Sequence, residues 1–196
     1  MKRMDIEALC PQPGTSKAAP GHTVLPDLLR KLAITRANQV WALDTTYIPM
    51  AKGFVYLTAV VDVASRRVLA HKVAVTLEAC HARQIIEQAF ARHGTPEIVN
   101  TDQGSQFTAT EFTDAIHAKG CKLSMDGRGA WRDNVFVERL WRTVKYEEVY
   151  LRGYDNVPAA RASVGRYWDF YNARRPHSSH DGRTPDQVWF AGLPSC

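Results

Sequence analysis

The chain has 196 residues, a length that suits one domain with short appendages. Its hydrophobic fraction of 45% predicts a packed core, and the lack of any apolar run of about 18 residues argues against a membrane span. The net charge of +5 is compatible with binding to a phosphate backbone. The four cysteines form no Cys-x-x-Cys pair, which predicts free thiols in a reducing cytoplasm rather than a zinc knuckle.

Prolines and glycines interrupt the start of the chain, so residues 1–37 are expected to form a flexible N-terminal segment. The pattern changes at residue 38. Runs of apolar and β-branched residues at 40–48, 54–63 and 68–75 each predict a strand. Turn residues separate these runs, which predicts an antiparallel meander.

The rest of the chain alternates helical and strand patterns. Residues 76–93 have helical spacing, with Thr76 as the expected N-cap and Gly94 as the stop. Strands are expected at 96–100 and 122–125, helices at 110–119, 134–150 and 157–171, and short turns around Pro176 and Pro185.

This order of elements is similar to an RNase H-like fold. It predicts an α/β protein with a five-stranded mixed sheet and helices on both faces. We expect residues 38–150 to form the core of the protein and residues 151–196 to form a helical C-terminal extension of it.

Three carboxylates occupy positions at which a site for hard cations is expected. Phosphodiester chemistry needs such cations, and they bind oxygen ligands. Asp44 lies within the first predicted strand, Asp102 directly follows the fourth, and Glu138 lies one turn into the long helix at 134–150. Each also has an ordinary explanation: a solvent-facing strand residue for Asp44, a turn or helix cap for Asp102, and a surface salt bridge for Glu138.

The spacing of these three acids along the chain favours a shared functional role. A gap of 35 residues separates Asp102 from Glu138, and with Asp44 upstream this is the D, D-35-E pattern. Further motifs accompany it in order at 38–49, 61–67, 100–107, 124–129, 133–141 and 171–177. Over roughly residues 35 to 190 the chain therefore resembles the catalytic core shared by retroviral integrases and bacterial insertion-sequence transposases, above all the second-reading-frame (OrfB) type.

The resemblance implies a DNA transposase or integrase whose Asp44, Asp102 and Glu138 bind two ions of Mg²⁺ or Mn²⁺. It also implies that Arg142 and Lys145, which share a helix face with Glu138, contact DNA.

Two further segments are interpreted through the resemblance. The loop Gly127-Arg128-Gly129 resembles the mobile loop beside the integrase active site, which makes Arg128 a candidate DNA contact; a plain connecting loop is the alternative. Asp62 recurs in the family too, and we interpret it as a structural residue that holds the turn before Arg66 and Arg67.

The implied reaction is metal-dependent DNA cleavage followed by strand transfer, in a bacterial cytoplasmic, nucleoid-associated protein that works as a multimer on element ends and target DNA. Family members usually carry a helix-turn-helix segment before the core, and this chain begins too late to hold one. Either the first-frame (OrfA) product recognises the element ends or the chain is truncated. Two alternatives stay open: an inactive remnant that binds DNA or a partner transposase, and an RNase H-type nuclease.

Overall fold

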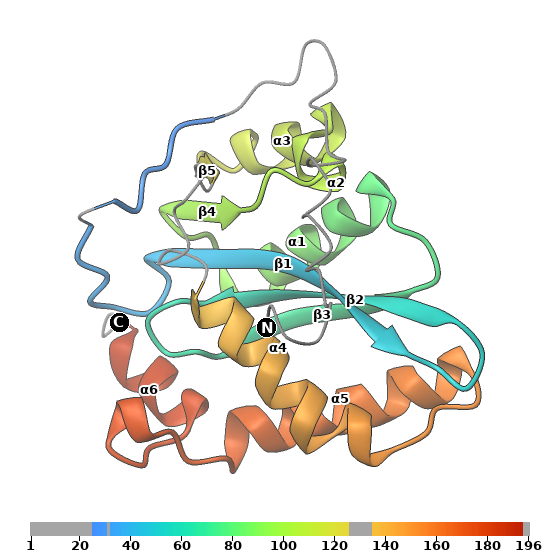
Figure 1. Cartoon of the computed structure of the whole chain (residues 1–196). Coiled ribbons are helices and arrows are strands. Elements are labelled where there is room, and N and C mark those ends of the chain that lie inside the picture. The colour runs from blue at the N-terminus through green and yellow to red at the C-terminus, as the bar shows by residue number, and fades with distance from the viewer. Residues whose placement is uncertain (1–24, 31, 126–134, 194–196) are drawn as a thin grey trace, which may run out of the picture.

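The computed structural model describes residues 25–30, 32–125 and 135–193 (Figure 1). Most of the predicted N-terminal segment at 1–37 and the whole Gly127-Arg128-Gly129 loop lie outside these ranges. In chain order the elements are β1 (Val40–Pro49), β2 (Phe54–Asp62), β3 (Val68–Ala74), α1 (Ala79–His93), β4 (Ile98–Thr101), α2 (Ser105–Thr108), α3 (Thr110–His117), β5 (Lys122–Met125), α4 (Val135–Glu147), η1 (Val149–Leu151), α5 (Val157–Ala173), η2 (Ser178–His180) and α6 (Pro185–Gly192).

The five strands form one sheet in the order β3-β2-β1-β4-β5. The first three strands make the predicted antiparallel meander, while β4 and β5 run parallel to β1. Residues 40–43 of β1 are all buried, as expected for a central strand whose sheet is covered on both faces. The mixed five-stranded sheet confirms the predicted fold class.

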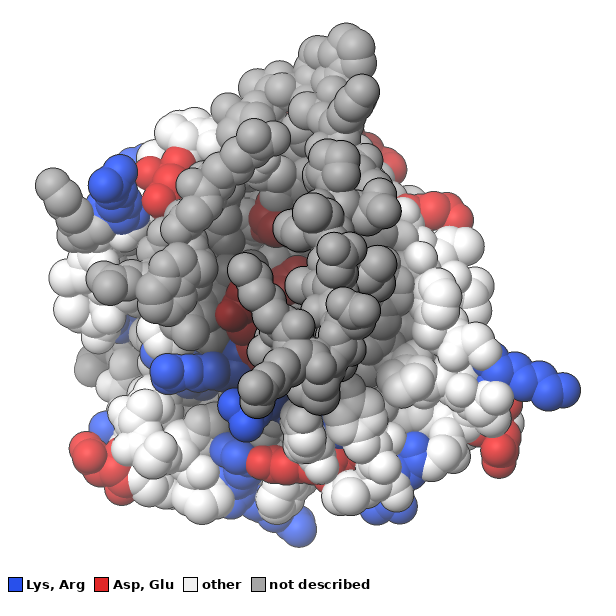
Figure 2. Space-filling view, viewed as in Figure 1, with Lys and Arg blue, Asp and Glu red and all other residues white. Residues whose placement is uncertain are grey.

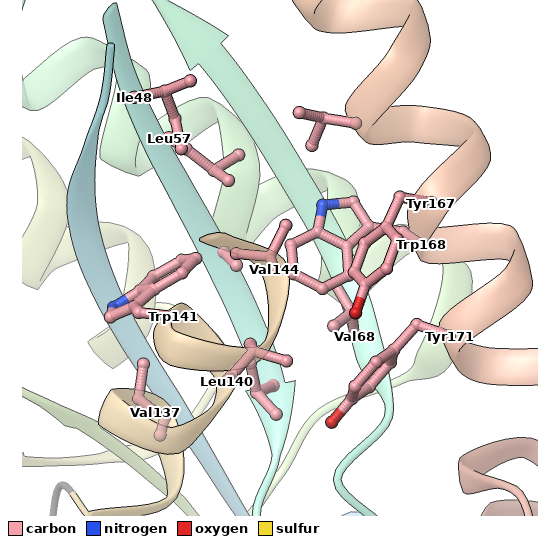
Figure 3. Close-up of a cluster of buried hydrophobic side chains, with 14 of the residues drawn as sticks. Ile48, Leu57, Val68, Val137, Leu140, Trp141, Val144, Tyr167, Trp168 and Tyr171 are labelled. Carbon is pink, nitrogen blue, oxygen red and sulfur yellow. The ribbon is translucent and has the colours of Figure 1, made fainter. Parts of the chain in front are cut away.

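The side chains of β1 alternate between two hydrophobic cores, one on each face of the sheet. Val40 and Ala42 belong to the α4–α5 core, and Trp41 and Leu43 belong to the α1–α3 core. Even-numbered residues of β1 therefore point toward α4, and odd-numbered ones point toward α1. The main helical members of the α4–α5 core are Val137, Leu140, Trp141, Val144, Tyr167, Trp168 and Tyr171 (Figure 3). Those of the α1–α3 core are Ile85, Ile86, Phe90, Phe107, Phe112 and Ile116.

Helix α1 begins at Ala79, three residues after the predicted cap at Thr76. Its N-cap is Glu78, which makes no side-chain capping bond. The hydroxyl of Thr76 is instead within hydrogen-bond distance of His81 Nε2, at 3.2 Å, so it does not serve as a cap. The predicted end is confirmed, because Gly94 takes a φ of 77° and donates its N–H to Phe90 O.

The prediction of a simple turn around Pro185 is wrong, because Pro185 begins helix α6. Thr184 caps this helix in a capping box with Gln187, and a proline in the first turn loses no intrahelical hydrogen bond. Arg67 holds α6 against the body through a 2.6 Å ion pair with Asp186. Within the described ranges no helix has both the length and the apolar character needed to cross a bilayer.

Candidate active site

Asp44 lies in β1 and points toward α4. As an even-numbered residue of this strand it faces the α4–α5 core, and its carboxylate is half-buried there. Trp141 of α4 donates its indole N–H to Asp44 Oδ2 at 2.8 Å, and the backbone N–H of Thr45 donates to Oδ1 at 2.7 Å. The alternative of a strand acid that merely faces solvent does not fit these contacts.

Asp102 directly follows β4 and neighbours Asp44 across the sheet. In the parallel pairing of β1 with β4, Leu43 lies opposite Thr101, so Asp44 and Asp102 follow the same rung of the ladder. Ile98 of β4 belongs to the α4–α5 core and Val99 belongs to the α1–α3 core, so even-numbered side chains of β4 point toward α4. Asp102, one residue after β4, lies on the α4 side as well if the same alternation continues. Asp102 thus lies beyond the end of β4, where open α/β sheets bind ligands, and Asp44 lies within β1 beside it.

The surroundings of Asp102 leave its carboxylate poorly stabilised. Burial raises its pKa, although the backbone N–H of Gly104 donates to Asp102 Oδ1 at 2.9 Å and opposes the rise. Gly104 also permits a close approach, because a Cβ at this position would lie 2.9 Å from Asp102 Oδ1 and 2.6 Å from the Gln106 amide. A desolvated carboxylate with one such donor is a good ligand for a cation.

Glu138 lies in the first turn of α4, and its side chain is exposed. Trp141, three residues later and so adjacent on the helix surface, reaches Asp44. Helix α4, which carries Glu138, therefore contacts Asp44 through Trp141. The register of β1 with β4 places Asp102 next to Asp44. The three carboxylates do not form a group whose ligand atoms all lie within 4.8 Å of one another.

That spread is wider than the span of oxygens bound to one ion, whereas the ligands of two ions span a larger distance. Mg²⁺ binds oxygens at about 2.0–2.1 Å, and paired catalytic ions lie about 3.5–4 Å apart. Carboxylates on opposite sides of such a pair are therefore up to roughly 8 Å apart. Glu138 is exposed and has three side-chain torsions, so its carboxylate is able to move relative to the carboxylates of Asp44 and Asp102.

The two cations predicted on α4 lie near this site. Arg142 is exposed, with its guanidinium 5.9 Å from the centroid of the Tyr146 ring, and Lys145 is half-buried. Figure 2 shows Asp and Glu atoms in the middle of this face of the molecule and Lys and Arg atoms gathered below them. Arg128, the third predicted DNA contact, lies outside the described residues.

Asp62 has the structural role predicted for it. It is fully buried and accepts hydrogen bonds from the Ser65 N–H at 2.8 Å, the Ser65 hydroxyl at 2.6 Å and the Asn38 N–H at 3.0 Å. These bonds hold the turn between β2 and β3. Burial nevertheless raises the pKa of Asp62, and the three donors only partly oppose this effect.

A separate ligand cluster was missed by the sequence analysis. Ligand atoms of Glu78, Cys80 and His81 lie within 4.8 Å of one another at the start of α1. The Glu-x-Cys-His spacing was the available signal. Because α1 packs on the sheet face opposite to α4, and because thiol and imidazole ligands are softer than carboxylates, this cluster is no part of the Asp44–Asp102 site.

Comparison with known proteins bears on the same residues. Two family models, both described as integrase core domain, match residues 34–130 and 119–185. The chain is 31% identical over 164 residues to the transposase for insertion sequence element IS904 of Lactococcus lactis, covering 82% of this chain and 65% of the relative. It is 31% identical over 153 residues to transposase InsF of IS3A from Escherichia coli, covering 76% of this chain and 53% of that protein.

Solved structures share the fold. The HTLV-2 integrase catalytic core domain in complex with magnesium aligns with a TM-score of 0.57 and 21% identity, over 79% of this chain and 97% of that one. A chain of the simian T-cell lymphotropic virus intasome in complex with PP2A regulatory subunit B56 gamma aligns with a TM-score of 0.66 and 19% identity, over 90% of this chain and 63% of that one. This chain spans 53–65% of the length of the two transposases compared above. With both models matching in sequence order around the two aspartates and the glutamate, the chain belongs to the integrase core domain family.

Proposed function

We propose that this chain is the catalytic core of an insertion-sequence transposase that cleaves DNA at element ends and joins the freed 3′ ends to target DNA. One observation supports the proposal most strongly: Asp44 and Asp102 directly follow the last paired residues of β1 and β4, and Trp141 ties Asp44 to the helix that carries Glu138. We propose that these three acids, in the D, D-35-E order, act as one site.

The donor set fits divalent metal. All three groups are carboxylates, the hard oxygen ligands that Mg²⁺ and Mn²⁺ prefer, and the half-buried Asp102 gains from a nearby cation. We propose that Asp44, Asp102 and Glu138 hold two such ions. When bound, the ions supply Lewis acidity for the attacking and leaving oxygens of an in-line displacement.

The residues of the chain orient the reaction. The indole of Trp141 fixes Asp44 Oδ2, and the N–H of Gly104 fixes Asp102 Oδ1, so both aspartates are held before DNA arrives. In the first step water displaces the 3′ oxygen from an element-end phosphate, which leaves a 3′-OH on the element and a phosphate on the flanking strand. In the second step that 3′-OH displaces an oxygen of a target phosphate. Arg142, Lys145 and Arg128 hold the backbone during both steps.

The partners are proposed on the same basis. Joining two element ends to one target needs at least two active sites, so the working unit is a multimer on DNA. The first-frame (OrfA) helix-turn-helix product is the proposed source of element-end recognition, and the nucleoid is the place of action. We also propose that residues 38–150 form the core and that 151–196 extend it, because α5 contributes Tyr167, Trp168 and Tyr171 to the α4–α5 core.

The test compares three isosteric variants in a strand-transfer assay on labelled element-end DNA. Asp102→Asn and Glu138→Gln are expected to abolish Mg²⁺-dependent cleavage and joining while leaving the circular dichroism spectrum unchanged. Glu111→Gln is the matched control, because Glu111 is also an exposed acid in the first turn of a helix, α3, and is expected to keep full activity.

Two outcomes would contradict the proposal. Unchanged joining by either active-site variant would remove these residues from the chemistry. A wild-type chain that binds element ends but never cleaves them, under conditions in which a full-length relative does, would indicate a remnant. An RNA–DNA hybrid supplied beside duplex DNA separates an RNase H-type nuclease, which would cut the hybrid alone.

A further inference from the structure

A cavity of about 260 Å³ lies on the flank of α4. Three elements close it: the β2–β3 turn, α4, and the segment that runs from the end of α5 into η2. Its polar lining consists chiefly of Arg66, Arg139, Arg175, His177, Ser178 and Ser179. The cavity is lined by cations and hydroxyls from three regions far apart in the sequence.

The positive charge of this cavity is not balanced within its lining. No aspartate or glutamate is among the described residues that line it. Arg175 is paired with Glu147, which lies behind it, through bonds of 2.8 and 2.5 Å. Arg66 and Arg139 form no ion pair with any carboxylate in the described ranges, and they repel each other. Three guanidinium groups thus share one cavity, and the nearby carboxylates of Glu147 and Asp62 lie outside its lining.

Arg66 shows that this charge is held in place rather than free in solvent. Its guanidinium stacks on the Phe136 ring, 3.3 Å from the centroid, and donates to Val63 O at 2.5 Å. Burial lowers the pKa of Arg66 to about 10, and the charge of Arg139 adds to this effect. A fixed, partly desolvated guanidinium attracts an anion more strongly than a solvated one does.

His177 also lines the cavity, and its Nε2 atom is buried without a hydrogen-bond partner among the described residues. A buried polar atom left without a partner is costly, so a turn of the ring that lets Nε2 bond to a ligand is favourable. Since a molecule of liquid water occupies about 30 Å³, the cavity has room for a tetrahedral oxyanion together with its waters.

The cavity adjoins the proposed catalytic face of α4. Arg139 directly follows Glu138, and a turn of about 100° per residue places the two on neighbouring flanks of the helix. Arg142 and Lys145 lie along the Glu138 face. Figure 2 shows Lys and Arg atoms below the central Asp and Glu atoms, over the region in which Figure 1 draws α4. A strand that presents one phosphate to Glu138 can therefore extend others toward the cavity.

We propose that this cavity binds a backbone phosphate of the DNA strand that lies across α4, with Arg66 and Arg139 as its principal donors. The proposal rests on DNA being the substrate, as in the proposed function. Arginine forks match the paired oxygens of a phosphate, and such contacts fix the register of the protein on DNA without reading its sequence. The site is a positioning site, distinct from the three catalytic carboxylates.

Arg139→Ala provides the first test, because Arg139 is exposed and its loss leaves the cores intact. Binding of a labelled duplex is followed by fluorescence anisotropy in metal-free buffer over a series of salt concentrations. We expect several-fold weaker binding and a slope of log K against log salt reduced in size by about 0.9, the value for one phosphate contact. Arg83→Ala is the matched control: Arg83 is an exposed helix arginine on the opposite sheet face, and its loss is expected to change neither quantity.

A second arm uses inorganic phosphate alone. Phosphate is expected to raise the melting temperature of the wild type and of Arg83→Ala, and to raise that of Arg139→Ala much less. Equal phosphate shifts in all three proteins would overturn the cavity as an anion site. A phosphate shift that depends on Arg139, combined with an unchanged DNA salt slope, would overturn DNA as the source of the phosphate.

Neither arm requires catalysis, so the outcome is separate from that of the strand-transfer test. A chain that joins no DNA still reports on the cavity through anisotropy and melting. Conversely, an Arg139→Ala protein that behaves like the wild type leaves the Asp102 and Glu138 results untouched.

Discussion

Replacing Trp141 with phenylalanine isolates the bond between α4 and Asp44. The substitution keeps an aromatic ring in the α4–α5 core but removes the indole N–H that donates to Asp44 Oδ2 at 2.8 Å. Trp168→Phe is the matched control. Trp168 lies in the same core, and its Nε1 is buried without a partner in the described part of the chain. Both changes remove a similar volume, so their difference reports the hydrogen bond.

The expected magnitude follows from the two environments. A hydrogen bond to a charged group contributes about 1.5–3 kcal/mol, and water around the half-buried Asp44 reduces this to about 1–2 kcal/mol. Removing the unpaired N–H of Trp168 recovers about 1–2 kcal/mol of desolvation cost. Trp141→Phe is therefore expected to be less stable than Trp168→Phe by about 2–4 kcal/mol, or roughly 5–10 °C in melting temperature.

Urea denaturation followed by circular dichroism measures this difference without relying on tryptophan fluorescence. The cycle is completed with Asp44→Ala, in whose background Trp141→Phe is expected to cost no more than Trp168→Phe. Strand transfer by Trp141→Phe is expected to fall about 10–100-fold, the usual effect of losing a group that orients a metal ligand. Equal stabilities of the two phenylalanine variants, in both backgrounds, would refute the reasoning.

Three other changes have defined outcomes. Gly104→Ala puts a methyl group 2.9 Å from Asp102 Oδ1 and should lower DNA cleavage and cost about 1–3 kcal/mol of stability, whereas Gly153→Ala, with open space around it, should do neither. Burial, helped by nearby cations, lowers the pKa of His177 to about 4 from an ordinary 6.5. The folded chain therefore binds this proton less readily than the unfolded chain, and stability should fall as pH drops from about 6.5 to 4. His177→Asn should flatten that pH profile in urea titrations, and an unchanged profile would exclude the effect. Asp62→Ala leaves the buried N–H of Ser65 and the partly buried N–H of Asn38 without their acceptor and should lower the free energy of unfolding by about 2–3 kcal/mol, measured in the same titrations.

Elements with a strong hydrophobic pattern were predictable from the sequence to within a few residues. The run from Phe54 is a central strand because both of its faces are covered, and its predicted end at 63 differs from the observed Asp62 by one residue. Errors arose where one residue type has two roles. Pro185 was interpreted as part of a turn, although a proline after a capping threonine equally begins a helix.

The candidate site divides in the same way. Order and spacing singled out Asp44, Asp102 and Glu138, because spacing along one chain is visible in a sequence. The hydrogen bond from Trp141 to Asp44 could not be predicted, since a tryptophan in an apolar helical stripe predicts only core packing. That prediction is confirmed by its 6% exposure, but the direction of the N–H depends on which face of β1 meets α4. Arg66, Arg139 and Arg175 come from three separate elements, so no local pattern links them.

The topology also gives a physical reason for the gap of 35 residues between Asp102 and Glu138. After Asp102 the chain makes α2 and α3, whose Phe107, Phe112 and Ile116 all belong to the α1–α3 core. It then adds β5 at the edge of the sheet, ending at Met125, and α4 begins at Val135 in the core on the opposite face. The gap is thus the length needed to cover one face, complete the sheet edge and cross to the other face.

A deletion within α2 or α3 would uncover the α1–α3 core, whereas the position of Glu138 relative to Asp44 depends on α4 through Trp141. Spacing and geometry therefore have different origins in this fold: packing of the α1–α3 face sets the number of residues, and a contact on the α4 face sets where the glutamate lies.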